Sequence, residues 1–486
     1  MTQAIHGIQP RKVDIIHALA QTMPQPAAAK SSVWPCLAPA LTSGLLLWMC
    51  YFPLAWGWLG WVALVPLLFL VRAQATPRRI YWCAYAAGSV FFWPALWWMP
   101  VNAHMIGAWV LLSVYCAAYL PVAIALIRLL DRKTILPLVY SVPIVWTALE
   151  FARSWLLTGF AWYYLGHTQH AMLSLIQIAD LGGVYLISFL VAAVNAWLFD
   201  LLFQFPAMRD VCRWEEPKHL RDMGRPLAGG SVWRPGLKYE AGLLLVAFVC
   251  TLIYGAWRLG QNRFQQGPLL ALLQTNLGQD IRDEAQDQPK RQATKDATAA
   301  HVDRLCPLAI KQAVVPDLII WPETSYLPQF PWLESSPQLP VEKIPDLFAR
   351  AEAAMHMHLR RELLRFYPAN HLLGLNSYVL GTDAKERRYS SALLVQKDGR
   401  FAARYDKMHR VPFGEYVPLR GWVPFIESVS PYEGDFDISA GAKRTRFELG
   451  KHKFGVLICY EDTDPFMARG YVRADADGAP VDFLVN

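Results

Sequence analysis

The sequence predicts a polytopic α-helical membrane domain followed by an α/β extracytoplasmic domain. Three observations lead to this prediction. Seven apolar runs lie before or around Arg258, with lengths suited to crossing a bilayer. Beyond Arg258, charged residues occur throughout, and strand-like segments alternate with helix-like ones. In this second part, Glu323, Lys407 and Cys459 each follow a strand-like segment.

The composition agrees with a membrane protein that carries a soluble domain. The 486 residues exceed the size of one compact domain, and 54% of them are hydrophobic while only 17% are charged. The net charge of +7 is mild, and the basic residues lie mainly in loops between apolar runs. A nucleic-acid partner would require basic residues clustered on one face, so we expect no nucleic acid as partner. The apolar runs lead us to expect a lipid bilayer instead.

We expect seven transmembrane helices in a membrane domain of residues 36–258. Runs of this length satisfy their backbone polar groups in a bilayer only as helices. The run from Cys36 to Val71 has no charged residue and provides two short spans that are interrupted near Pro53–Trp58. The other five expected spans are Ile80–Ala103, Met105–Ile127, Thr134–Leu157, Leu181–Phe203 and Ala241–Trp257.

Basic residues in alternate loops predict the orientation of these spans. Lys and Arg precede the first span and follow the second, fourth and sixth spans. The loops around Pro53, Asn102 and residues 159–170 contain neither. Because loops rich in Lys and Arg stay in the cytoplasm, residues 1–35 form a cytoplasmic tail. Everything after Arg258 is then extracytoplasmic.

Two charged residues, Glu150 and Arg153, lie at i,i+3 spacing in or beside the fifth expected span. Charges inside a membrane usually have a function. The alternative is a local pair near the membrane surface, and the sequence leaves both interpretations open.

Residues 268–486 are expected to form the α/β domain. The expected helices are Lys295–Val314 and one or two helices within residues 341–366. An Asp-Gly turn at Asp398–Gly399 suits a hairpin. The expected strands are Pro268–Gln274, Asp317–Trp321, Leu372–Gly381, Ser390–Gln396, Phe401–Tyr405, Phe447–Leu449 and Lys453–Ile458. A further strand-like pattern is still in progress at Asn486, so we expect this domain to be incomplete at its C-terminus.

Glu323, Lys407 and Cys459 occupy equivalent positions after their strands. Ligands of open α/β sheets bind outside the carboxyl ends of strands, so we expect the three side chains to meet there. Taken singly, the Cys could be core packing, the Glu a helix cap and the Lys a solvated residue. Together, a thiol, a carboxylate and an ammonium are the groups that acyl transfer through a thioester requires.

No metal or cofactor is expected. The eight cysteines include no Cys-x-x-Cys spacing, and the 12 histidines are scattered.

Three stretches resemble the nitrilase superfamily and, within it, the apolipoprotein N-acyltransferases. They are Ile320-Trp-Pro-Glu-Thr-Ser, the long stretch from Tyr405 to Pro418, and Gly455-Val-Leu-Ile-Cys-Tyr-Glu-Asp. In the membrane half, Leu157-Thr-Gly-Phe-Ala-Trp followed by Asp180-Leu-Gly-Gly-Val-Tyr is also similar to the family.

The resemblance implies a nitrilase-like αββα sandwich with a Glu-Lys-Cys triad at Glu323, Lys407 and Cys459. It implies supporting or substrate-binding roles for Glu415, Tyr460 and Glu461. For Glu415 the alternative is a carboxylate that only fixes its loop, and for the other two it is local packing.

The implied reaction is N-acylation of the α-amino group of a diacylglyceryl-cysteine. A phospholipid would donate the acyl group, and a prolipoprotein would accept it after removal of its signal peptide. The implied location is the bacterial inner membrane, with the catalytic domain in the periplasm. Two rival hypotheses are a membrane-tethered nitrilase-type amidase or hydrolase, and a catalytically inactive binding module.

Overall fold

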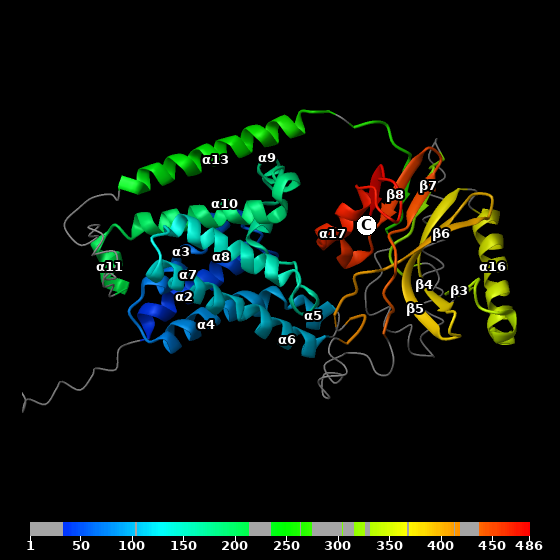
Figure 1. Ribbon diagram of the computed structural model, residues 1–486, viewed down its shortest axis with the longest axis horizontal. Helices are drawn as coiled ribbons and strands as arrows, with labels where there is room; N and C mark the ends of the chain where they lie inside the picture. The colour runs from blue at the N-terminus through cyan, green and yellow to red at the C-terminus, as the bar shows by residue number, and fades with distance from the viewer. Residues whose placement is uncertain are drawn as a thin grey trace, which may run out of the picture.

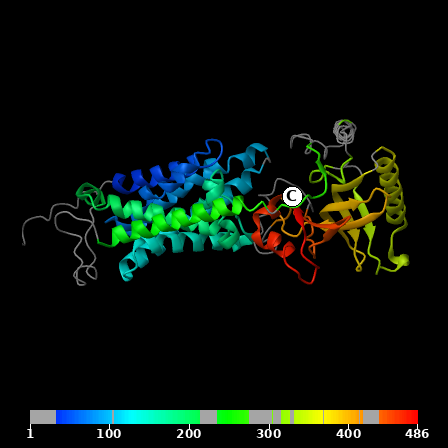
Figure 2. The ribbon, with the colours of Figure 1, turned by 90° about the horizontal axis from the view of Figure 1, so that it is seen from above.

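A computed structural model describes the chain in two parts, a helical bundle and an α/β domain that lies beyond one end of it (Figures 1 and 2). The expected helix Lys295–Val314, apart from Arg304, and residues 1–32 of the expected tail lie outside the described residues. The described residues are 33–102, 105–212, 235–262, 264–274, 304, 315–325, 331–366, 369–412, 414–417 and 437–486.

Each of the seven expected apolar runs contains helix. The helices are α2 (Trp34–Met49), α3 (Val65–Arg72), α4 (Pro77–Ala95), α5 (Trp98–Asn102), α6 (Ile106–Ala117), α7 (Tyr119–Lys133), α8 (Leu138–Arg153), α9 (Leu173–Ile176), α10 (Ala179–Leu202), α11 (Pro206–Cys212) and α13 (Pro235–Leu259). Three continuous stretches among the described residues are long and apolar enough to cross a bilayer: Ile106–Lys133, Ala179–Leu202 and Gly236–Leu259. The number of seven spans therefore remains a prediction.

Small residues allow the first helices to pack closely. A Cβ on Gly44 of α2 would come within 2.3 Å of the carbonyl oxygen of Ala87 in α4. A Cβ on Gly88 of α4 would come within 2.6 Å of the carbonyl oxygen of Ala117 in α6. Since helices in a bilayer associate mainly through close van der Waals packing, these glycines bring α2, α4 and α6 together.

One basic residue used to predict the orientation is not a solvated loop residue. Arg72 ends α3 and is buried, and its guanidinium binds Asp200 at 2.9 Å and Asp131 at 3.2 Å. Pairing of this kind is how charged side chains are accommodated inside helical membrane domains.

The α/β domain contains two sheets between two helices, in the order α17 (Pro465–Tyr471), second sheet, first sheet and α16 (Asp346–Phe366) (Figure 1). This arrangement confirms the expected αββα sandwich. The first sheet has the order β1-β2-β4-β5-β6, with β3 beside β4, and the second has the order β7-β8-β9. The strands are β1 (Leu270–Leu272), β2 (Leu318–Ile320), β3 (Trp332–Ser335), β4 (Asn370–Leu380), β5 (Glu386–Val395), β6 (Phe401–Asp406), β7 (Arg446–Leu449), β8 (His452–Val456) and β9 (Phe483–Val485).

Alternating side chains of the first sheet supply two separate cores. On one face, Leu372 and Tyr405 pack in a cluster with Phe447 and Phe454 of the second sheet. On the other face, Leu373 of β4 belongs to the cluster that includes Met355 and Leu359 of α16. This period of two is the geometry of a strand buried on both faces.

Two strand predictions need correction. Strand β5 begins at Glu386, four residues before the expected Ser390. The expected start was too late because the first half of the strand is polar and shows no alternation of apolar residues. Strand β3 was not predicted, since only Trp332 of its four residues is fully buried. The remaining expected strands in the described residues form, with small differences at their ends.

Strand direction brings Glu323 and Lys407 together, whereas Cys459 follows β8 of the second sheet. Strands β2 and β4 are parallel, whereas β5 is antiparallel to both β4 and β6. Strands β2 and β6 therefore run in the same direction and end at the same edge of the first sheet.

Candidate active site

Cys459 lies three residues beyond β8, where the chain leaves the second sheet. Leu457 and Ile458 are buried, whereas the Cys459 side chain is exposed and opens the 3-10 turn Cys459–Thr463. Cys459 has φ +55°, in the left-handed region that non-glycine residues seldom adopt. Such a conformation persists only where surrounding contacts hold it, and it is most common at functional sites.

Lys407 is the central residue of the site. It directly follows β6, its side chain is fully buried, and its Nζ atom lies 3.5 Å from Glu323 Oε1 and 2.7 Å from Glu415 Oε1. Glu323 follows β2 by three residues. The structure thus brings the carboxylate and the ammonium into contact, as their positions after parallel strands predict.

Glu323 and Glu415 each have a second partner. The hydroxyl of Ser390 on β5 donates to Glu323 Oε1 at 3.4 Å. The backbone N–H of Val411 donates to Glu415 Oε2 at 2.7 Å. Glu415 therefore both fixes its own loop and holds the ammonium, which combines the two interpretations that the sequence left open.

The charges of the site act on one another. Burial by itself lowers the pKa of Lys407, but the carboxylates of Glu323 and Glu415 outweigh burial and raise it. The pKa of Cys459 is raised to about 11, first because the surrounding protein displaces water and then because of the Glu323 charge, against the opposing effect of Lys407. At neutral pH the site holds an ammonium and a protonated thiol.

Glu461 ties the segment of Cys459 to the segment of Lys407. Its fully buried carboxylate accepts hydrogen bonds from the backbone N–H groups of Ile458, Met408 and His409 at 2.8, 2.6 and 2.9 Å. The hydroxyl of Tyr405 donates to both carboxylate oxygens. Burial raises the pKa of Glu461, and these donors oppose that rise. The carboxylate thus fixes the two segments relative to each other.

Tyr460 ties the same turn to the helical bundle. Its ring is buried, and its hydroxyl accepts from the N–H of Ala161 at 3.2 Å and donates to the carbonyl of Gly159 at 3.3 Å. The ring of Trp162 meets it edge-on at 5.5 Å. A residue that the sequence could assign to local packing therefore makes contacts about 300 residues away in the chain.

The junction between the two parts also carries an apolar rim. A cavity of about 190 Å³ lies beside Tyr460 and is lined in part by Trp155, His409 and Phe466. The exposed rings of Trp155, from the bundle, and Phe466, from α17, meet edge-on at 5.0 Å. Aromatic side chains in such positions are typical of the membrane surface.

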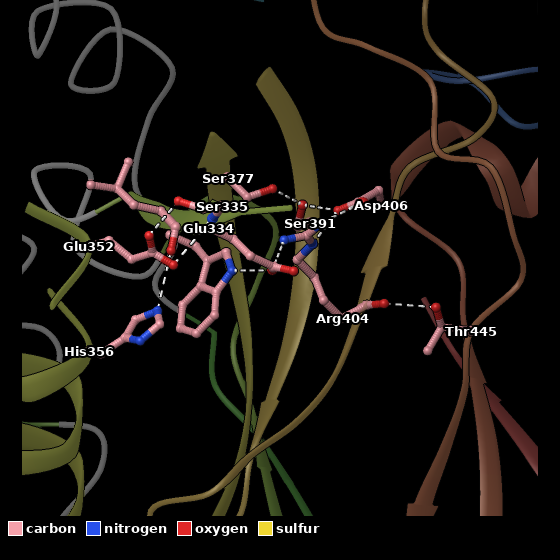
Figure 3. A network of polar contacts seen from close by, with 11 residues as sticks. Glu334, Ser335, Glu352, His356, Ser377, Ser391, Arg404, Asp406 and Thr445 are labelled. Atoms are coloured by element: carbon pink, nitrogen blue, oxygen red, sulfur yellow. Dashed lines mark hydrogen bonds and ion pairs between the residues drawn. The ribbon is translucent and has the colours of Figure 1, made fainter. Parts of the chain in front are cut away.

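A separate polar network supports the end of β6 on the other face of the sheet (Figure 3). Asp406 accepts from the hydroxyl of Ser391 at 2.6 Å and from Arg404 Nε at 2.9 Å. Arg404 also pairs with Glu334 of β3, and Ser377 of β4 lies within hydrogen-bond distance of Ser391. Since Asp406 immediately precedes Lys407, this network fixes the strand end that presents the ammonium.

The sequence interpretation missed several contributors to the site. Ser390 and Tyr405, which bind Glu323 and Glu461, lie on strands that were predicted. Because side chains alternate between the two faces of a strand, the face to which Ser390 and Tyr405 point could have been predicted as well. Gly159 and Ala161 carried no local signal for a contact with Tyr460. Among the described residues, no group of three His, Cys, Asp or Glu side chains is placed to hold a metal ion.

A sandwich of this type with a thiol at a strand end is the architecture of the carbon-nitrogen hydrolase class. Residues 269–481 match the family model described as "Carbon-nitrogen hydrolase", and residues 43–197 match "Apolipoprotein N-acyltransferase N-terminal domain".

Curated relatives extend over both parts. The apolipoprotein N-acyltransferase of Geobacter metallireducens is 32% identical over 445 residues, which cover 90% of this chain and 74% of the relative. The apolipoprotein N-acyltransferase of Rhodopirellula baltica is 28% identical over 461 residues, which cover 86% of this chain and 74% of the relative. The chain therefore belongs to the apolipoprotein N-acyltransferase family, and the expected acyltransferase class is confirmed.

Among solved structures, a carbon-nitrogen hydrolase from Helicobacter pylori has 18% identity and a TM-score of 0.25, covering 38% of this chain and 53% of its own. This likeness adds nothing to the assignment.

Gly374→Ala should disturb the position of Glu323. A Cβ on Gly374 of β4 would lie 2.0 Å from the carbonyl oxygen of Pro322 and 3.0 Å from the Cα of Glu323, so the backbone must shift. We expect the free energy of unfolding to fall by about 1–3 kcal/mol and acyl transfer to fall with it. Denaturant unfolding and an activity assay measure both. Gly267→Ala is the matched control, because its Cβ meets nothing within 4 Å; equal behaviour of the two variants would contradict the prediction.

Proposed function

We propose that this chain transfers an acyl group from a phospholipid to the α-amino group of a diacylglyceryl-cysteine at the N-terminus of a lipoprotein. Membership of the family supports the acyl transfer and the lipoprotein class of acceptor. The observation that carries the chemistry is the contact of Lys407 with Glu323, with the ammonium 3.5 Å from the carboxylate and both charges acting on the thiol of Cys459.

In the first half-reaction, Cys459 Sγ attacks the ester carbonyl of the phospholipid. Because the thiol is protonated at neutral pH, Glu323 takes its proton as the new S–C bond forms. The tetrahedral intermediate then collapses, the ester C–O bond breaks, and the lysophospholipid alkoxide leaves with the proton from Glu323. The acyl group remains on Cys459 as a thioester.

In the second half-reaction, the acceptor amine attacks the thioester carbonyl. Glu323 removes the proton of the amine, the C–S bond breaks, and the thiol of Cys459 is restored with that proton. The result is an amide on the lipoprotein and a free enzyme, which makes the sequence ping-pong.

Lys407 serves both half-reactions by stabilising the oxyanion. Its raised pKa keeps it cationic at neutral pH, and within the described residues Glu323 and Glu415 occupy two of its three donor positions. The remaining N–H is available to the developing negative charge, an effect worth on the order of 3 kcal/mol for one donor. Glu415 holds the ammonium in place, and Glu461 and Tyr460 hold the nucleophile turn.

We further propose a multi-pass arrangement in the bacterial inner membrane, with residues 268–486 as the catalytic domain on the periplasmic side. Both substrates are lipids, and the apolar rim of Trp155 and Phe466 beside the site suits access from the bilayer surface.

The decisive experiment is mass spectrometry of a diacylglyceryl lipopeptide incubated with the protein and phospholipid. We expect the peptide to gain the mass of one acyl chain on its amine, and we expect Cys459→Ala to abolish this gain while remaining inserted in the membrane. Release of free fatty acid without amide formation would instead favour the hydrolase hypothesis. Transfer by Cys459→Ala would refute the assignment of the nucleophile.

Glu323→Gln should lower two measured quantities. Removing the carboxylate takes away a negative charge that raises the pKa of Cys459, so the midpoint of its alkylation rate should move below about 11. Acyl transfer at pH 7 should fall by about 10²–10⁴-fold, because the general base is lost. Alkylation of Cys459 across pH and initial rates of transfer measure these effects. A variant that kept full transfer would exclude Glu323 as the base, and failure of native Cys459 to react at any pH would favour a binding module.

The orientation is tested with reporters fused after residue 260 and within the loop around residues 209–212. We expect the first fusion to be active only outside the cytoplasm and the second only inside, because the Lys and Arg residues lie in alternate loops. A cytoplasmic signal from the first fusion would overturn the arrangement.

A further inference from the structure

The loop that contacts Tyr460 is held from inside the bundle by two buried charges. Arg153, at the end of α8, donates from Nη2 to the carbonyls of Trp162 and Tyr163 at 3.0 and 3.3 Å. Glu150, one turn earlier, accepts at Oε1 from the backbone N–H of Leu165 at 2.7 Å. Both side chains are about 5% exposed or less.

These contacts argue against the local ion pair, one of the two interpretations that the sequence left open. Glu150 and Arg153 are not joined by an ion pair in the described structure, although they are one helical turn apart. Each of them instead binds backbone groups of the loop 159–165, and Trp146 Nε1 also donates to Glu150 at 2.9 Å. Rings of Tyr164 and Phe92 lie 5.0 and 5.4 Å from the Arg153 guanidinium and fix its direction.

The loop needs such support because its backbone is unusual. Within it, Gly159 and Tyr163 have φ +87° and +59°, and Leu157 just before it has φ +54°. Left-handed conformations at non-glycine residues persist only where surrounding contacts impose them. The N–H of Phe160 closes the loop onto the carbonyl of Arg153 at 2.7 Å. Arg153 thus holds the loop with both its backbone and its side chain.

A continuous chain of contacts therefore links the bundle to the nucleophile. It runs from the Arg153 guanidinium to the carbonyls of Trp162 and Tyr163, and along the loop to Gly159 and Ala161. Both of these bind the hydroxyl of Tyr460, the residue that follows Cys459. Cys459 itself has the left-handed backbone that depends on such external contacts.

We propose that Arg153 and Glu150 are positioning residues for acyl transfer, which fix the loop 159–165 and through Tyr460 set the direction of Cys459 toward Glu323 and Lys407. This inference rests on the proposed function. It makes the bundle a part of the active-site framework and explains why two charges remain buried in an otherwise apolar helix, where they are unfavourable without a role.

The test compares full-length Arg153→Gln, Arg153→Lys and Tyr460→Phe in phospholipid vesicles. We expect Arg153→Gln to lower kcat by about 10–100-fold with little change in KM, because the nucleophile is misplaced while the lipid surface is intact. Arg153→Lys keeps a cationic donor for the loop carbonyls and should recover part of the loss. Tyr460→Phe removes the link at its other end and should reproduce the effect of Arg153→Gln.

A second readout does not depend on acyl transfer. When the turn is released, Cys459 moves away from the surrounding protein and the carboxylates that raise its pKa, so the midpoint of its alkylation should fall from about 11 toward that of an ordinary thiol in both Arg153→Gln and Tyr460→Phe. Glu323, Lys407 and Glu415, the charged groups that act on the thiol, are unchanged in these variants. The midpoint remains informative even if Cys459→Ala shows the proposed reaction to be wrong.

Arg72→Gln is the matched control, since it removes an equally buried guanidinium that binds Asp131 and Asp200 instead of the loop. We expect this variant to lose stability while the alkylation midpoint of its folded fraction stays unchanged. An unchanged midpoint and kcat in Arg153→Gln would overturn the inference. So would the same midpoint shift in Arg72→Gln, which would mark a general loosening of the bundle.

Discussion

The buried ammonium of Lys407 is the constraint on which the site depends. A cation removed from water is strongly unfavourable unless opposite charges and hydrogen bonds replace the lost hydration. Here Glu323 and Glu415 provide this compensation, and they come from different segments of the chain. The requirement to neutralise one side chain therefore draws the end of β2 and the loop after β6 toward a common point.

Two further residues fix the turn of Cys459 in different directions. Glu461 binds it to the segment that follows β6, through backbone N–H groups on both sides. Tyr460 binds it to the loop after α8. Adjacent residues thus connect the turn to the first sheet and to the bundle. A thiol whose φ lies in the left-handed region has little conformational freedom between two such attachments.

Much of the fold could be predicted, because period-two alternation marks buried strands and strand ends in parallel arrangement share one edge. This reasoning singled out Glu323 and Lys407, which the structure brings into contact, whereas Cys459 follows a strand of the second sheet. The catalytic roles of all three remain a prediction. The polar first half of β5 and the mostly half-buried β3 gave no such pattern. The contact of Tyr460 with Gly159 joins residues 301 positions apart, and nothing local encodes it. The positive φ of Cys459 and the burial of Arg72 likewise follow from tertiary contacts.

The place of α17 in the sandwich has a consequence for the evolution of this architecture. In Figure 1 this helix lies between the second sheet and the end of the bundle, so one outer layer of the sandwich faces another part of the same chain. Residues on this layer, such as Phe466, then come under selection from two neighbours at once. A substitution at Phe466 would then alter how the α/β domain packs against the bundle without touching Glu323, Lys407 or Cys459.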